Sequence, residues 1–217
     1  MAAVKGFGAM APEYGGEGKR GPGRPRSFDR PQALGEALKL FWERGYEGTS
    51  FDDLVAAMRI SPSSFYNSFG SKERLYREAV ECYLASSGEW FLGELDADAD
   101  TRTAFRSLLR TAAREFTRAD RPSGCMISLA GTHVPPALDA VRATMAGHRM
   151  DAEAAMAARI RRGIADGDVP ARTDAAALAA FYGALSRGLA VQARDGASTQ
   201  RLLDIVDLAM NAWPASP

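Results

Sequence analysis

The sequence predicts an all-α protein in which a small three-helix unit precedes a larger helical domain. Apolar residues recur at helical spacing, strand signals are absent past residue 85, and Gly, Pro, Asp and Ser divide the helical stretches. With 217 residues, the chain is long enough for one sizeable helical domain and a small one. We expect a disordered extension over residues 1–21, the small unit over 22–80 and the larger domain over 81–217.

A first helix is expected between Phe28 and Tyr46, because Asp29 suits the N-cap, Pro31 falls in the first turn and Gly45 can end the helix. The Gly/Pro-rich stretch GKRGPGRPR precedes it and is too poor in apolar residues to fold alone. A flexible basic arm beside a DNA-reading unit can follow the minor groove. The arginines expected to make that contact are Arg24 and Arg26.

Two short helices joined by a tight turn follow. Thr49 or Ser50 is expected to cap the first, which ends at Met58, and Ser61 to cap the second, with Pro62 at its first position. Gly70 permits the left-handed residue that ends the second helix. This is the layout of a helix-turn-helix.

The second short helix is expected to bury Phe65 and Phe69, which are four residues apart. Its outer side then carries short hydrogen-bonding groups with few charges, a face that suits base edges and phosphates. Ser71 is expected to cap the following helix, where Lys72 and the free N–H groups beside it would form a phosphate site. The expected DNA contacts of the helical unit are Thr49, Ser50, Ser61, Ser63, Ser64, Tyr66, Asn67 and Lys72.

Residues 22–80 resemble the N-terminal domain of the TetR/AcrR family of bacterial transcriptional regulators. The features that coincide in the family's order are Gly45-Tyr46, Thr49-Ser50, Ser61, Phe65-Tyr66 and Phe69-Gly70-Ser71-Lys72. The resemblance implies a homodimeric, ligand-responsive repressor whose remaining chain binds a small-molecule inducer and forms the dimer. A twofold protein would bind two half-sites about one helical turn apart, so a palindromic operator of double-stranded DNA is expected.

Two positions depart from the family pattern. Arg59 stands in the turn where glycine is usual, and a non-glycine residue with positive φ costs on the order of 1 kcal/mol. Either the turn is reshaped or Arg59 gains a phosphate contact. Pro62 stands where lysine is frequent, so one cationic contact is absent and binding is expected to depend more on the arm.

Past residue 85, the helix begun at Ser71 is expected to continue through Leu95. Further helices are expected over residues 101–119, 123–131, 136–165, 174–194 and 198–213. The last two carry many small and apolar residues that permit close helix approach, so they are interpreted as halves of an intermolecular four-helix bundle. The alternative is that these faces serve only the core of one protomer. The residues assigned to the dimer interface are Ala179, Gly183, Gly188, Leu202, Ile205, Val206 and Ala209.

Aromatic and methionine side chains of the middle helices suit an adaptable apolar site, so an apolar or aromatic inducer is expected. The competing interpretation is that most of these side chains pack in the core. The residues assigned to the pocket are Trp90, Phe105, Leu109, Phe116, Met126, His133, Met145 and Phe181. Neither His133 nor His148 has a second ligand at metal-binding spacing, so no metal or other cofactor is expected.

Cys82 and Cys125 have the character of reduced cytoplasmic thiols. Cys125 follows Arg121 near an expected helix N-terminus, where the dipole and a cation would lower its thiol pKa, so a sensor role is a second interpretation.

Composition agrees with a regulator that works in the cytoplasm. Formal net charge is zero, so positive charge is only local. No stretch has the roughly 18 uninterrupted apolar residues of a membrane span, and no apolar signal region is present. No nucleophile elbow, phosphate loop or paired acid motif supports an enzyme. The alternative to a DNA-binding regulator is an interaction or ligand-binding module whose helix-turn-helix does not read DNA.

Overall fold

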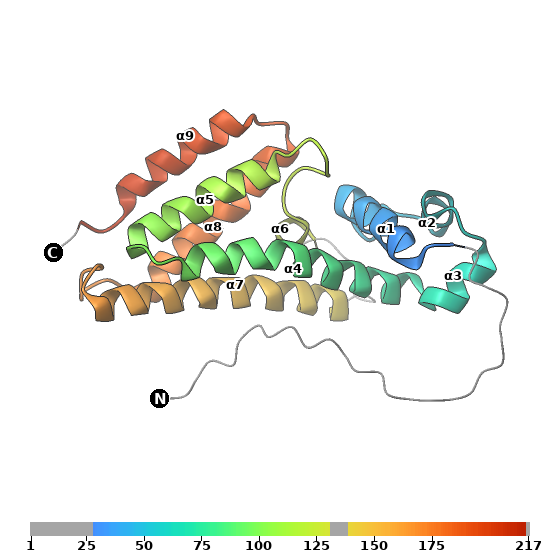
Figure 1. The fold of residues 1–217 in the computed structure, drawn as a ribbon, viewed down its shortest axis with the longest axis horizontal. Coiled ribbons are helices and arrows are strands. Elements are labelled where there is room, and N and C mark those ends of the chain that lie inside the picture. The colour runs from blue at the N-terminus through green and yellow to red at the C-terminus, as the bar shows by residue number, and fades with distance from the viewer. Residues whose placement is uncertain (1–27, 131–138, 216–217) are drawn as a thin grey trace.

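The computed structural model describes residues 28–130 and 139–215, and over these residues the chain is helical without strands (Figure 1). The all-α prediction is therefore confirmed. The extension over residues 1–21, the arm arginines Arg24 and Arg26, and His133 lie outside the described residues.

The reading head, defined here as residues 28–71, contains three short helices at one end of the molecule (Figure 1). They are α1 (Arg30–Arg44), α2 (Phe51–Met58) and α3 (Pro62–Phe69). Local chemistry sets their ends, because each N-cap side chain accepts a hydrogen bond from a backbone N–H that the helix itself leaves free. The caps are Asp29, Ser50 and Ser61.

Arg59 adopts the left-handed conformation at the C-cap of α2, with φ of 53° and ψ of 43°. The turn thus keeps the shape that glycine would give it and is not reshaped. Because this conformation is costly for a side chain with a Cβ, Arg59→Gly is expected to raise the free energy of unfolding by about 0.5–1 kcal/mol. Urea unfolding followed by circular dichroism measures the change.

Ala56→Gly provides the matched control, because Ala56 is exposed within α2 in a right-handed conformation. There, glycine is expected to lower the free energy of unfolding by about 1 kcal/mol. Equal destabilisation by both substitutions would contradict the account of Arg59.

A single long helix, α4 (Lys72–Asp96), begins beside α3 and continues into the larger domain, where it lies beside α7 (Figure 1). Its N-cap is Ser71, whose Oγ accepts a hydrogen bond from the Arg74 N–H at 3.1 Å. The helix is continuous across residues 80 and 81, between which the domain boundary was predicted, so it connects the reading head directly to the larger domain.

The larger domain packs α4 with α5 (Thr101–Phe116), α7 (Asp139–Asp166), α8 (Ala175–Arg194) and α9 (Thr199–Ala209), which continues as the short 3-10 helix η2 (Met210–Ala212). Figure 1 shows α4 and α7 side by side, with α5, α8 and α9 forming the other side of the bundle. Helices α5, α8 and α9 start close to the predicted positions, because Asp100, Asp174 and Ser198 act as their N-caps.

The sixth helix is shorter than predicted. The expected range was 123–131, whereas α6 runs only over Met126–Leu129. Gly124 sets the later start, because it has a φ of 83° and donates its N–H to the Phe116 carbonyl at 2.8 Å, which closes a loop back onto the end of α5. The loop also lies close to α8: a Cβ on Gly124 would lie 2.7 Å from the Ala190 carbonyl oxygen.

Two hydrophobic cores divide the molecule. One joins the reading head to the first half of α4 and extends to Met126 and Met145 of α6 and α7. The other lies among α4, α5, α7, α8 and α9. Because α6 and α7 contribute to the first core, the reading head is held by the larger domain and not by α4 alone. Within the described residues, no helix combines the length and apolar character needed to span a membrane.

Candidate nucleic-acid interface and ligand cavity

Helix α3 presents an uncharged polar face to solvent. Phe65 and Phe69 are fully buried, as the four-residue spacing predicted, and they fix which side of the helix faces outward. Ser63 and Asn67 are exposed, and Ser64 is half-buried. The Asn67 amide has no hydrogen-bond partner among the described residues, so both its donor and its acceptor are available to a base edge.

Tyr66 extends this face next to α2. Its side chain is 57% exposed, and its ring stacks on Phe51 with centroids 5.3 Å apart. The stacking holds the ring in place, and the side chain remains accessible to solvent. A tyrosine fixed in this way suits the positioning of a phosphate, for which it was predicted.

The hydroxyl groups of Ser50 and Ser61 are engaged within the protein. Ser50 Oγ accepts from the Asp53 N–H at 3.0 Å, and the Asp53 carboxylate accepts from the Ser50 N–H at 3.1 Å, which completes a capping box. The Ser50 hydroxyl also donates to the Asp53 carboxylate at 2.7 Å, and this bond, followed by the one from the Ser50 N–H, lowers the pKa of Asp53. Ser61 Oγ accepts from the Ser64 N–H at 3.2 Å. Both serines are exposed, but their primary role is to start the helices.

Thr49 corrects the predicted set of DNA contacts. Its side chain is fully buried, and its Oγ1 donates to the Gly45 carbonyl at 2.8 Å. A buried hydroxyl cannot reach a phosphate, so the assignment of Thr49 to DNA was wrong. The residue instead ties the end of α1 to the start of α2, and Ser50 is the cap.

Lys72 stands at the first position of α4, as predicted, with its Nζ 4.2 Å from the centre of the Tyr46 ring. Partial burial lowers the pKa of Lys72, and the ring holds its side chain. Arg59 is exposed and has no ion pair among the described residues. Lys72 and Arg59 therefore place positive charge beside the polar face of α3.

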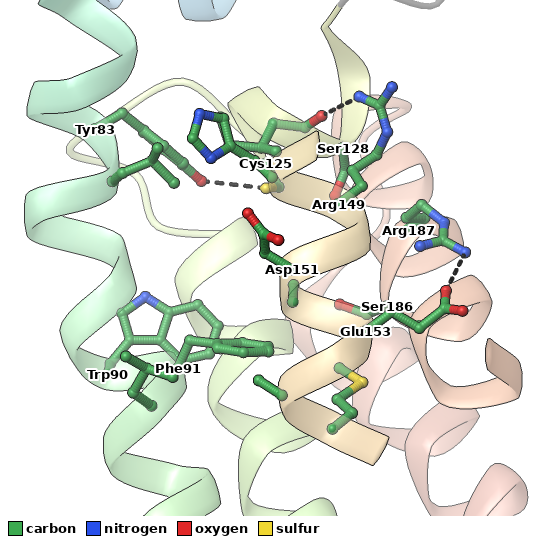
Figure 2. A pocket seen from close by; sticks show the side chains of 18 of the residues that line it. Tyr83, Trp90, Phe91, Cys125, Ser128, Arg149, Asp151, Glu153, Ser186 and Arg187 are labelled. Atoms are coloured by element: carbon green, nitrogen blue, oxygen red, sulfur yellow. Dashed lines mark hydrogen bonds and ion pairs between the residues drawn. The ribbon is translucent and has the colours of Figure 1, made fainter. Parts of the chain in front are cut away.

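The larger domain contains a cavity of about 620 Å³ among α4, α6, α7 and α8 (Figure 2). Its volume falls within the range of roughly 300–1,000 Å³ typical of small-molecule sites. Trp90 and Phe91 of α4 form one wall, and Phe116 and Met156 add to the apolar lining. The cavity is therefore the candidate ligand site.

Of the residues predicted for the pocket, Trp90 and Phe116 line this cavity. Four other assignments to the pocket were wrong, because these side chains pack in the cores and do not border the cavity: Phe105, Leu109, Met126 and Met145. Phe181 was also wrong, since it lies on the outer surface with 47% of its side chain exposed. His133 lies outside the described residues.

Sequence reasoning missed the polar lining, which comes from helix positions far apart in the chain. Arg149, Asp151 and Glu153 belong to α7, and Ser186 and Arg187 belong to α8. Charged residues on a helix usually face solvent, so no local pattern distinguishes these from their neighbours. Only the approach of α7 to α8 brings them to one cavity.

Cys125 is half-buried, borders the cavity and accepts a hydrogen bond from the Tyr83 hydroxyl at 3.3 Å (Figure 2). It is the N-cap residue of α6, near the position that the sequence indicated. Arg121, however, forms an ion pair with Glu115 at 3.1 Å, so its charge is largely compensated. The sensor role of Cys125 stays a prediction, and Cys82 is exposed.

The predicted dimer surface divides into buried and exposed residues. Ala179, Leu202 and Val206 are fully buried in the protomer's own core, and Gly183 is buried against the cavity, so these four assignments were wrong. The alternative interpretation, that such faces serve the core of one protomer, is correct for them. The assigned residues that remain accessible are Gly188, Ile205 and Ala209.

A different face of α8 is exposed and apolar. Its members recur at alternating spacings of four and three residues and form what we call the α8 stripe: Ala177, Phe181, Ala184, Gly188 and Val191. On the neighbouring helix α9, Leu208 has 70% of its side chain exposed. This spacing is that of a helix seam that packs against another helix.

Family models match both parts of the chain. Residues 33–79 match "Bacterial regulatory proteins, tetR family", and residues 103–206 match "Tetracyclin repressor-like, C-terminal domain". The chain belongs to the TetR family of transcriptional regulators, whose members bind DNA and typically form dimers that respond to ligands.

Individual relatives agree with this assignment. The HTH-type transcriptional repressor ComR of Escherichia coli (strain K12) is 32% identical over 198 residues, which cover 90% of this chain and 94% of ComR. A cysteine-substituted variant of the TetR family regulator CifR, solved in complex with a 26-base-pair operator, is 44% identical with a TM-score of 0.86. That match covers 88% of this chain and 100% of the CifR chain. A TetR regulator from Rhodococcus sp. RHA1 is 32% identical with a TM-score of 0.58, covering 86% of this chain and 99% of its own.

Proposed function

We propose that this chain is a homodimeric repressor that binds a palindromic operator through α3 and leaves it when a small molecule occupies the cavity. The observation that carries the proposal is the exposed, uncharged face of α3 beside the cations Lys72 and Arg59. An interaction module that does not bind DNA would not need these cations beside a polar helix face. We place its action in the cytoplasm and assign it no catalytic role.

The α8 stripe supports the dimer. Two copies of α8 and α9 would form a four-helix bundle in which Ala184 and Gly188 permit close approach and Phe181 packs on the partner. An interface of this kind relates two reading heads by a twofold axis. The operator is then expected to be a palindrome whose half-sites are about one helical turn apart.

One shared helix and the contacts of two further residues support a connection from the cavity to the reading head. Helix α4 carries Trp90 at the cavity and Lys72 at the DNA side. Tyr83, which also borders the cavity, packs edge-on against Trp42 of α1, with ring centroids 4.8 Å apart. Arg194 at the end of α8 donates to the Trp42 and Glu43 carbonyls, the latter at 2.8 Å.

A ligand that displaces the cavity wall would therefore move both α4 and α1. The separation of the two reading heads changes, and they no longer fit successive grooves. The operator is released, which derepresses transcription.

Selection of bound duplexes from a random DNA library tests the proposal directly. The purified protein is expected to enrich a palindrome, and a double variant, Tyr66→Ala with Asn67→Ala, is expected to enrich none. Absence of enrichment by the native protein at low salt would contradict the proposal and favour a non-DNA interaction module.

Two single substitutions separate sequence reading from phosphate contact. Asn67→Ala is expected to relax preference at one or two operator positions, because an asparagine amide discriminates bases by about 1–3 kcal/mol. Lys72→Ala is expected to weaken binding to all sequences alike and to reduce the slope of log affinity against log salt by about one. Fluorescence anisotropy over a salt series measures both effects.

Lys39→Ala is the control for charge, since Lys39 is exposed on α1 and already paired with Glu36 at 2.9 Å. Its salt slope should equal that of the native protein. An Asn67→Ala protein with unchanged discrimination would refute the base-reading role of Asn67.

A further inference from the structure

One side of the cavity holds two guanidinium groups with incomplete charge compensation. Arg149 donates through Nη1 to the Ile127 and Ala130 carbonyls, at 2.8 and 3.0 Å, and has no ion pair among the described residues. Arg187 lies 3.6 Å from Glu153, which is an ion pair but longer than a hydrogen bond. Among the half-buried Arg, Lys, Asp and Glu residues of the cavity lining, two cations therefore stand against one carboxylate.

Arg149 retains hydrogen-bond donors that no protein acceptor uses. Both of its bonds involve Nη1, so the N–H groups on Nη2 and Nε are unpaired within the described part of the chain. Burial, and after it the like charge of Arg187, lower the pKa of Arg149. An anion placed between the two guanidinium groups would relieve both effects.

Two serine hydroxyls lie on the same side. Ser128 of α6 and Ser186 of α8 are half-buried and have no hydrogen-bond partner in the described ranges. Figure 2 shows Arg149, Arg187 and the serines on one side of the cavity, with Trp90 and Phe91 across from them. The cavity thus has a polar, cationic end and an apolar, aromatic end.

Acidic residues also border the cavity and would favour the opposite charge. Glu81, Glu89 and Asp151 are unpaired in the described structure, but all three are exposed, so water and salt screen their charge. Arg149 is half-buried, and its charge is screened less. Because the exposed carboxylates are screened more than the half-buried guanidinium groups, the cavity is expected to prefer a negatively charged ligand.

We propose that the cavity binds an amphipathic carboxylic acid, with its carboxylate on Arg149 and Arg187 and its apolar or aromatic body against Trp90 and Phe91. The planar fork of a guanidinium matches a carboxylate through two parallel hydrogen bonds. The inference rests on the proposed function, in which this cavity holds the inducer.

Isothermal titration calorimetry with three compounds of the same body and different head groups tests the proposal. Phenylbutyrate is expected to bind at least about tenfold more tightly than phenylbutyramide, and phenylbutylammonium more weakly still. Trp90→Ala is expected to weaken all three, which locates binding at the cavity.

Variants of the guanidinium groups complete the test. Arg149→Gln and, independently, Arg187→Gln are expected to reduce the preference for phenylbutyrate over its amide to about twofold or less. Arg149→Lys keeps the charge without the fork and should retain part of the preference. The matched control is Arg142→Gln, because Arg142 is exposed on α7 and paired with Asp139 away from the cavity lining.

Equal binding of phenylbutyrate and its amide, or tightest binding of the ammonium compound, would overturn the carboxylate inference while leaving a ligand cavity in place. Failure of all three compounds to bind would overturn it as well. The duplex selection is independent of these measurements, so a failure of the DNA-binding function would be recognised separately.

Discussion

Phe181→Glu is expected to convert the proposed homodimer into monomers and to weaken operator binding by on the order of 100-fold, because two linked reading heads bind about that much more tightly than a single one. Phe181 is the largest member of the α8 stripe, and 47% of its side chain is exposed in the protomer. A glutamate there would place a charge in the middle of an apolar interface without a partner. Sedimentation velocity measures the oligomeric state, and fluorescence anisotropy measures affinity for the operator.

Met150→Glu provides a matched control for this substitution. Met150 is also a large exposed apolar residue, with 71% of its side chain accessible, but it lies on α7 and outside the stripe. It should leave both the dimer and operator affinity unchanged. A Phe181→Glu protein that remains dimeric would exclude the α8 stripe as the interface. Dissociation of the dimer by Met150→Glu would place the interface on α7.

Asp168→Ala is expected to lower the free energy of unfolding by about 3 kcal/mol, because it breaks a partly buried hydrogen-bond network that contains a charge. Asp168 accepts from the Thr101 N–H at 2.8 Å and from the Thr101 hydroxyl at 2.7 Å. Thr101 Oγ1 in turn accepts a hydrogen bond from Arg159, which is only 5% exposed. Without Asp168, the Thr101 N–H and hydroxyl lose their acceptor, and the buried guanidinium is left on a network without its carboxylate.

Urea unfolding followed by circular dichroism measures this loss. The control is Asp166→Ala, since Asp166 is exposed at the end of α7 and has no hydrogen bond or ion pair within the described residues. A change within about 0.5 kcal/mol is expected for it, as for most surface substitutions. Equal effects of the two substitutions would mean that the network contributes nothing to stability.

The reading head could be predicted in detail because its determinants are local. A cap such as Ser61 acts on a backbone N–H three residues away, and Phe65 and Phe69 select the buried face of α3 through their spacing. The sequence left open whether the turn at Arg59 is reshaped, and the structure shows that it keeps the left-handed conformation. Thr49 is a second exception, because its Oγ1 can bond to the end of α1 only once the two helices are in place.

The functional surfaces of the larger domain could not be predicted in the same way. Helix α8 has small and apolar residues on two faces, and spacing alone does not say whether Ala179 or Phe181 meets the core. The outcome depends on the approach of α5, α7 and α9, which buries Ala179 and leaves Phe181 exposed. For that reason the assigned dimer and pocket residues required correction.

The sequence by itself determined the helical class, the N-caps of the reading-head helices and the polar face of α3, because each depends on residues within a few positions of one another. Only the tertiary structure decided which face of α8 is free and how Arg149 and Arg187, on different helices, come to border one cavity. Burial and the shape of a cavity are properties of packed helices. They arise from contacts between residues far apart in the chain, which no local pattern encodes.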